Sequence, residues 1–188
     1  MNGSITLQAI LQAMHPTGSC GKKLKHKACW AKKKQKNKMR IGIISDTHGL
    51  LRPEVIESLD GCEAILHGGD INKQEIIDQL EKIAPVYAVR GNNDKEWAEN
   101  IPMCLDFELA GLRIYMTHKK KDLPKDLSPY DLVLIGHSHK YEESRQGTTL
   151  IFNPGSCGPR RFHQAITMAT AEISGGKKDI IIDAVMAE

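Results

Sequence analysis

The stretch Ile41–Gly49, IGIISDTHG, is a short apolar run that stops abruptly at an acid. Its isoleucines stand together without a charge, a pattern that predicts a strand buried on both faces of a covered sheet. The polar residues that follow form a loop at the carboxyl end of the strand, where α/β sheets place ligands. In this loop, Asp46 and His48 would point to the same side of an extended backbone. An ordinary polar loop carries the same residues, so this pair alone is a weak signal.

The same arrangement returns at other strand ends. Four more stretches that look like buried strands run into metal-binding side chains, which are Asp70, Asn92, His118 and the pair His137 and His139. Taken alone, each has an ordinary explanation, such as a helix cap, a turn or a satisfied polar residue. Because all of these explanations would have to hold at once, the repeated placement predicts one shared metal site.

From Met39 onward, strands and helices alternate with short connections. In the first half, strands are predicted over 41–44, 64–66 and 86–89, and helices over 53–59 and 73–83. Such units favour a parallel sheet with right-handed crossovers. The second half is mostly β, with strands predicted over 105–109, 113–117, 131–135, 148–152, 165–173 and 179–185. Helices early and strands late favour two sheets covered by helices over one doubly wound sheet.

The composition of the 188 residues, 40% hydrophobic and 26% charged, predicts one soluble domain with a real core and an appendage. No apolar run approaches the ~18 residues of a membrane span. Five irregularly spaced cysteines argue against a disulfide framework and favour a reducing cytoplasm. The sequence leaves a homo-oligomer open.

The formal net charge of +3 hides an asymmetry between the two parts of the chain. Residues 1–40 carry ten basic and no acidic side chains, whereas residues 41–188 carry 16 basic and 23 acidic ones. We therefore expect a basic extension over 1–38, disordered or upstream of the natural start, and a folded domain over 39–188. The acidic domain suits cations, and nucleic acid would be attracted only by the basic extension.

The predicted ligands number two carboxylates, four imidazoles and one amide, too many for one tetrahedral ion. They suit two ions of higher coordination bridged by a carboxylate, and the mixture of nitrogen and oxygen without thiolate favours Mn, Fe, Zn, Co or Ni. Two such ions acidify a bridging water and hold a phosphoryl oxygen for in-line displacement. The reaction that needs this chemistry is phosphoester hydrolysis.

At these residues the chain resembles the calcineurin-like metallophosphoesterases. The motifs that carry the resemblance are Asp46-Thr47-His48, Gly69-Asp70, Gly91-Asn92-Asn93-Asp94, His118, Gly136-His137-Ser138-His139 and Asn153-Pro154-Gly155-Ser156. The motifs stand in the expected order, and the resemblance covers about residues 39–188. The last motif narrows the resemblance to the small YfcE-like phosphodiesterases, relatives of the retromer subunit Vps29. The resemblance implies a four-layer α/β/β/α sandwich of two mixed sheets with a di-metal centre, often dependent on Mn²⁺ or Ni²⁺.

The resemblance also implies a role for each ligand. One ion would be held by Asp46, His48, Asp70 and His139. The other would be held by Asp70 as the bridge together with Asn92, His118 and His137. Asp70, Asn92 and His137 would take part in catalysis, with Asn92 also near the phosphate of a small phosphodiester substrate.

The chain departs from the family pattern at Asn93. Larger relatives have a histidine here that helps to protonate the leaving group, whereas an amide has no proton to deliver. A missing general acid costs ~10²–10⁴-fold for poor leaving groups, so we expect faster hydrolysis of activated aryl diesters than of alkyl monoesters.

Several basic residues follow the predicted ligands. Lys119-Lys120-Lys121 stand after His118, where glycine is usual, and either form a solvated run or attract anionic substrate. Arg160 and Arg161 are ambiguous in the same way. Together with Asn92 and Asn93, these two arginines are the candidate substrate contacts.

Two other functions stay open at this point. A scaffold like Vps29 would use the same fold as a protein-binding surface, but that scaffold has lost several metal-site residues, whereas all seven ligand positions are filled here. A nuclease would hold nucleic acid through the basic extension and would bind in a salt-sensitive manner.

Overall fold

The computed structural model describes residues 38–161, 163–174 and 179–186. Apart from Lys38, the predicted extension lies outside the described residues, so its boundary and disorder stay predictions.

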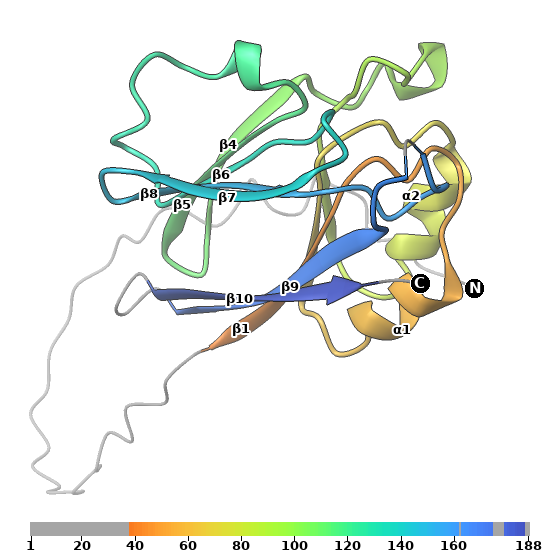
Figure 1. Ribbon diagram of the computed structural model, residues 1–188, viewed down its shortest axis with the longest axis horizontal. Coiled ribbons are helices and arrows are strands. Elements are labelled where there is room, and N and C mark those ends of the chain that lie inside the picture. Colours follow the sequence, from red (N-terminus) through yellow and green to blue (C-terminus); the bar gives the residue numbers. More distant parts are fainter. Residues whose placement is uncertain (1–37, 162, 175–178, 187–188) are drawn as a thin grey trace, which may run out of the picture. The chain divides into compact units, whose positions relative to one another are not determined.

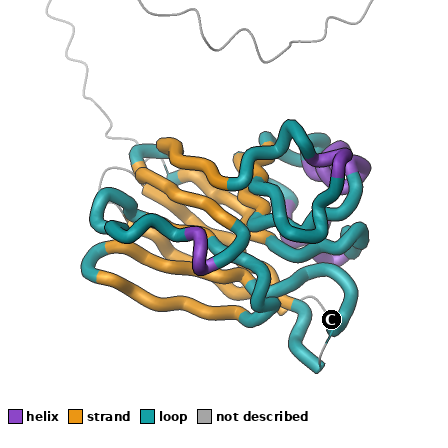
Figure 2. Tube along the Cα trace, turned by 90° about the horizontal axis from the view of Figure 1, so that it is seen from above, coloured by secondary structure: helices purple, strands orange, loops and turns teal. Residues whose placement is uncertain are grey.

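The described strands form two five-stranded mixed sheets that lie face to face (Figures 1 and 2). The strands of the first sheet are β1 (Met39–Ile44), β2 (Ala64–His67), β3 (Val86–Ala88), β9 (Thr167–Ser174) and β10 (Asp179–Met186). Those of the second are β4 (Cys104–Leu109), β5 (Leu112–Thr117), β6 (Leu132–Leu134), β7 (Tyr141–Gln146) and β8 (Thr149–Pro154). The two-sheet prediction is confirmed.

The order of the first sheet is β10-β9-β1-β2-β3, and that of the second is β4-β5-β6-β8-β7. Strands β1, β2 and β3 are parallel, as predicted, with Ile43 opposite Leu66. Strand β9 pairs antiparallel with β1 and with β10. In the second sheet, β4 and β5 form the predicted hairpin, and β5, β6 and β8 run parallel.

The unbroken apolar runs arise because both faces of the central strands are covered. In β1, the fully buried Ile41 and Ile43 pack between the sheets, in the same cluster as Leu134 and Phe152 of the second sheet. Ile44, on the opposite face, packs in a separate cluster with residues of the helices. A strand covered on both faces has no polar side to show in its sequence.

Two short helices belong to the cluster on the outer face of the first sheet. Helix α1 (Pro53–Leu59) begins with a proline in its first turn, as predicted, and buries Leu59. A Cβ at Gly42 would lie 2.1 Å from the side chain of Leu59, so only glycine lets the helix approach β1 this closely. Among the described residues, no helix is long and apolar enough to cross a lipid bilayer.

Helix α2 (Gln74–Leu80) ends three residues before the predicted end at Ile83. The N–H groups of Ile83 and Ala84 both donate to the carbonyl of Leu80, which closes the helix with a turn. Pro85 follows, and the residue before a proline is pushed out of the helical region. The prediction that this helix continues to Ile83 is therefore wrong.

The outer face of the second sheet is covered by the segment that joins β5 to β6. This segment contains the 3-10 turn η3 (Lys120–Asp122) and buries Leu127 and Tyr130 against Val133 and Ile135. The fold is the predicted four-layer sandwich, with its fourth layer made mostly of loop.

Strand β7 was not predicted. Every residue from Tyr141 to Gln146 is exposed, and the strand pairs only with β8 at the edge of its sheet. Charged edge strands discourage pairing with other chains, but they lack the apolar alternation by which strands are recognised.

Candidate metal centre

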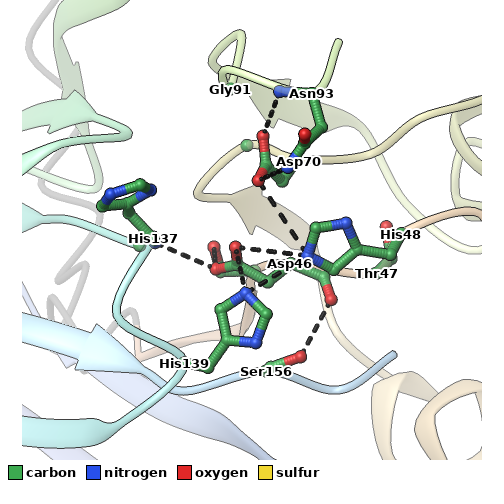
Figure 3. Close-up of polar contacts among 12 residues, drawn as sticks. Asp46, Thr47, His48, Asp70, Gly91, Asn93, His137, His139 and Ser156 are labelled. Atoms are coloured by element: carbon green, nitrogen blue, oxygen red, sulfur yellow. Dashed lines mark hydrogen bonds and ion pairs between the residues drawn. The ribbon is translucent and has the colours of Figure 1, made fainter. Parts of the chain in front are cut away.

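Loops from both sheets meet at one site and carry most of the predicted ligands (Figure 3). In the first sheet, the N–H of Asp46 donates to the carbonyl of Gly69 at 2.9 Å. In the second, the N–H of Gly136 donates to the carbonyl of His118 at 3.0 Å. The two sheets are joined where Nδ1 of His118 lies 2.8 Å from the carbonyl oxygen of Gly68. The site therefore depends on both sheets being in place.

Five of the predicted ligands have a left-handed backbone conformation. They are Asp46 (φ 54°), His48 (φ 46°), Asp70 (φ 55°), His137 (φ 71°) and His139 (φ 58°). The expectation that the loop ligands align in extended backbone is therefore wrong, although most of them do converge. A left-handed L-residue costs roughly 1–2 kcal/mol, and such residues cluster at functional sites.

Asp46 is fully buried and uses its two carboxylate oxygens differently. Oδ2 accepts hydrogen bonds from the hydroxyl of Ser45 at 2.6 Å and from the N–H of His137 at 3.1 Å. Oδ1 accepts none within the described residues and lies 3.2 Å from Nε2 of His139 and 3.8 Å from Nε2 of His48. One oxygen is thus fixed by hydrogen bonds, while the other faces the two imidazoles without a hydrogen bond from any described residue.

Asp70 is held by Asn93 through two hydrogen bonds. The backbone N–H of Asn93 donates to Oδ1 at 2.8 Å, and its side-chain amide donates to Oδ2 at 2.6 Å. Nε2 of His118 lies 3.4 Å from the same Oδ2. Burial opposes ionisation of Asp70, but His118 and the Asn93 hydrogen bonds outweigh it and hold the pKa of this carboxyl well below its ordinary value. Asp70 is therefore ionised.

His118 is oriented by the carbonyl oxygen of Gly68. A carbonyl can only accept, so Nδ1 carries the proton and Nε2 faces Asp70. Burial lowers the pKa of His118, but Asp70 and the other carboxylate of the site, Asp46, raise it above its ordinary value. A positive charge is thus favoured at Nε2, where a bound cation would replace the proton.

His48 and His139 place their Nε2 atoms 3.2 Å apart. Burial lowers the pKa of His48 below its ordinary value, and the positive charge of Arg161 lowers it further. A neutral imidazole is the form that binds metal. Both Nε2 atoms are thus positioned to donate to one ion.

The described residues offer two adjoining sets of donor atoms. One contains Asp46, His48 and His139, and the other contains Asp46, Asp70 and His118, with the donor atoms of each set within 4.8 Å of one another. Asp46 Oδ1 and His118 Nε2 are buried and form no hydrogen bond within the described residues. Atoms that coordinate a metal ion are expected to have this environment. The residues therefore fit two divalent ions, with Asp46 common to both sets. Asp70 belongs to one set and lies 3.9 Å from His48 of the other, so its role as the bridge stays a prediction.

The structure leaves two predicted ligands at the margin of these sets. The ring of His137 is exposed and lies edge-on to His118, with 5.2 Å between ring centroids. Asn92 is also exposed, and it is the neighbouring Asn93 whose side chain contacts Asp70. The roles of His137 and Asn92 as ligands stay predictions.

Asp94 holds together the two loops that carry Asp70 and Asn92. The sequence alone does not assign this role to it. Its carboxylate accepts hydrogen bonds from the N–H groups of Ile71 at 2.8 Å, Asn72 at 2.6 Å and Gly91 at 2.8 Å. These bonds join the loop after β2 to the loop after β3. The sequence signal for this role is the position of Asp94 directly after Asn93, in a polar loop that begins with Gly91.

Asn153 and Ser156 support the site from the end of β8. The side-chain amide of Asn153 donates to the carbonyl of Gly136 at 2.9 Å, and the hydroxyl of Ser156 donates to the carbonyl of Asp46 at 2.9 Å. The sequence motif that contains Asn153 and Ser156 indicates the family but does not reveal these hydrogen-bond partners.

Comparisons with known proteins identify similar sequences and structures. A family model described as the calcineurin-like phosphoesterase superfamily domain matches residues 39–176. A probable metallophosphoesterase of Methanothermobacter thermautotrophicus is 32% identical over 156 residues, covering 75% of this chain and 90% of the relative. Phosphodiesterase MJ0936 of Methanocaldococcus jannaschii is 30% identical over 141 residues, covering 63% and 84%.

A solved structure of vacuolar protein sorting 29 from Cryptosporidium parvum has the same fold. It superposes with a TM-score of 0.63 at 19% identity and covers 80% of this chain and 99% of its own. At this identity the likeness concerns the fold alone.

Proposed function

The chain belongs to the calcineurin-like phosphoesterase superfamily, and on that premise we propose that it is a phosphodiesterase with a di-metal centre. The observation that carries the proposal is the pair of donor sets that meet at the buried carboxylate of Asp46. Two adjoining divalent ions, Mn²⁺ in the first instance or Ni²⁺, Zn²⁺, Fe²⁺ or Co²⁺, would supply an activated water and polarise the phosphoryl group.

The residues of the chain would hold and orient this centre. Asp46 and His118 each have one polar atom fixed by a hydrogen bond and another directed at the site. Asp70 is kept ionised and is held in place by Asn93. Asn92 and His137 are the remaining proposed ligands. Preorganisation of this kind lowers the free energy spent on ordering the site when the substrate binds.

Asn93 carries the expectation about the substrate. Its amide donates to Asp70 and has no titratable proton to give to a leaving group. Diesters of good leaving groups, such as bis(p-nitrophenyl) phosphate, would therefore be hydrolysed faster than alkyl monoesters. Equal rates on both would contradict this account of Asn93.

The alternative is a protein-binding scaffold, favoured by the fold that the chain shares with vacuolar protein sorting 29. Hydrolysis of bis(p-nitrophenyl) phosphate with each divalent ion separates the two functions. We expect D46N and H118A to lose more than about a hundredfold in activity, while K125A, at an exposed lysine, keeps wild-type activity. Activity that survives in both ligand variants, or absence of activity with every ion, would favour the scaffold.

A further inference from the structure

A hollow lies beside the metal centre, next to the donor residue His139. It is open to solvent, its empty space of about 170 Å³ includes part of that solvent, and described residues between Ser156 and Ile166, after β8, form most of its lining. Pro159, Ala165 and Ile166 contribute apolar surface, while Arg160, Arg161 and Gln164 contribute polar groups. Because His139 forms part of its wall, a ligand in the hollow would lie beside any group held by the metal donors.

The hollow has two positive charges that no described residue neutralises through an ion pair. Arg160 and Arg161 are exposed, and neither forms an ion pair with any described residue. The region 41–188 carries more acidic than basic side chains, so two adjacent unpaired arginines beside the site stand out against it. Guanidinium groups bind phosphate through paired hydrogen bonds and are weakly hydrated, which suits them to an anion site.

The segment is anchored to the metal centre. The hydroxyl of Ser156 donates to the carbonyl of Asp46 at 2.9 Å, and Nε of Arg52 donates to the carbonyl of Gly158 at 3.1 Å. A Cβ at Gly158 would lie 2.2 Å from the carbonyl oxygen of Thr47, so the two loops are in direct contact. The backbone that leads into the two arginines is thus held against the loop that carries Asp46.

Gln164 adds to the hollow a hydrogen-bond acceptor to which no described residue donates. Its N–H donates to the carbonyl of Arg161 at 3.0 Å and closes a turn, while its buried Oε1 makes no hydrogen bond within the described residues. A buried carbonyl oxygen left unpaired is costly, and a hydroxyl group of a ligand would satisfy it.

We propose that this hollow is a subsite for a second phosphate group of the substrate, carried on a sugar whose hydroxyl reaches Gln164. The inference rests on the proposed phosphodiesterase function and names its substrate class: a phosphodiester with a further phosphate on the retained arm, as in a short oligonucleotide or a phosphorylated nucleotide ester. Arg160 and Arg161 bind this phosphate, and the metal donors face the scissile one.

Two chromogenic substrates test the subsite by hydrolysis. Thymidine 5′-(p-nitrophenyl phosphate) and its 3′-phosphorylated form share a leaving group and differ only in the second phosphate. We expect wild type to prefer the phosphorylated form by about tenfold or more in kcat/KM, the effect of one charge-assisted hydrogen bond. The R160Q/R161Q variant should lose this preference. R145Q, which removes a charge from the edge strand β7, should keep it.

A binding experiment gives the second readout. Calorimetry in excess chelator compares thymidine 3′,5′-bisphosphate with thymidine 5′-monophosphate on wild type, R160Q/R161Q and R145Q. The bisphosphate should bind about tenfold more tightly to wild type and R145Q but not to the double variant. Equal binding of both nucleotides to wild type, or a preference that survives in R160Q/R161Q, overturns the subsite. A binding preference without hydrolysis under any divalent ion leaves the subsite standing and refutes the phosphodiesterase proposal.

Discussion

Acid should weaken the fold through His67, a fully buried imidazole at the end of β2. Its Nδ1 accepts the N–H of Gly69 at 3.2 Å, and its Nε2 lies 3.1 Å from the hydroxyl oxygen of Thr47. An accepting Nδ1 is unprotonated, so the folded protein holds the ring neutral with its proton on Nε2. Burial is the main reason why the pKa of His67 falls from 6.5 to about 4.

The size of the effect follows from this pKa shift. The unfolded chain takes up a proton on His67 near pH 6.5, whereas the folded chain resists until about pH 4. Between these values the unfolded state binds more protons, so the free energy of unfolding falls as the pH falls. One pKa unit corresponds to about 1.4 kcal/mol, and the loss from neutral pH to pH 4 is therefore about 3 kcal/mol.

Urea unfolding of the metal-free protein at several pH values between 7 and 4 measures this loss. The control variant is H67Q, whose side-chain amide does not titrate, and every other side chain is the same in both proteins. We expect the free energy of unfolding of wild type to fall by about 3 kcal/mol more than that of H67Q over this range. Parallel pH profiles for the two proteins would refute the reasoning.

Three other changes should have measurable effects. A Cβ at Gly91 would lie 2.2 Å from the backbone N and Oδ1 of Asp70, so G91A should destabilise the protein by about 1–3 kcal/mol in urea unfolding, and a wild-type midpoint would contradict this. F152A should cost about 3–5 kcal/mol because Phe152 is fully buried, whereas I181A, at a side chain 53% exposed, should change stability by less than about 0.5 kcal/mol; similar losses in both would contradict the assigned core. Mn²⁺ at a hundred times its Kd should add about 2.7 kcal/mol per site in thermal unfolding, and D46N should show no such gain if Asp46 serves both ions.

Most strands of the two sheets were predictable because buried strands are recognisable in the sequence as runs of apolar residues. The run 41–44 in β1, covered on both faces, contains no charge, and its end is marked by the first polar residue, Ser45. Strand β7 has no such run because all of its residues are exposed. The end of α2 was predicted three residues too late. Ile83 follows Leu80 at the spacing expected of a helix, although the chain forms a turn there.

The candidate site was predictable by residue type but not in its geometry. Asp46, His48 and His139 could be grouped because each follows a buried strand. Whether Asn92 or Asn93 contacts Asp70 depends on loop dihedral angles, which residue spacing does not determine. The sharing of Asp46 between two donor sets likewise needs the relative position of two sheets, which only packing decides.

The left-handed backbone at five of the predicted ligands has a consequence for engineering this protein. Glycine would relax each of these positions and would also remove a donor atom. A library of variants selected for heat resistance in the presence of a chelator should therefore accumulate glycine at these five positions. The most thermostable variants would then be the ones that can no longer bind a cation.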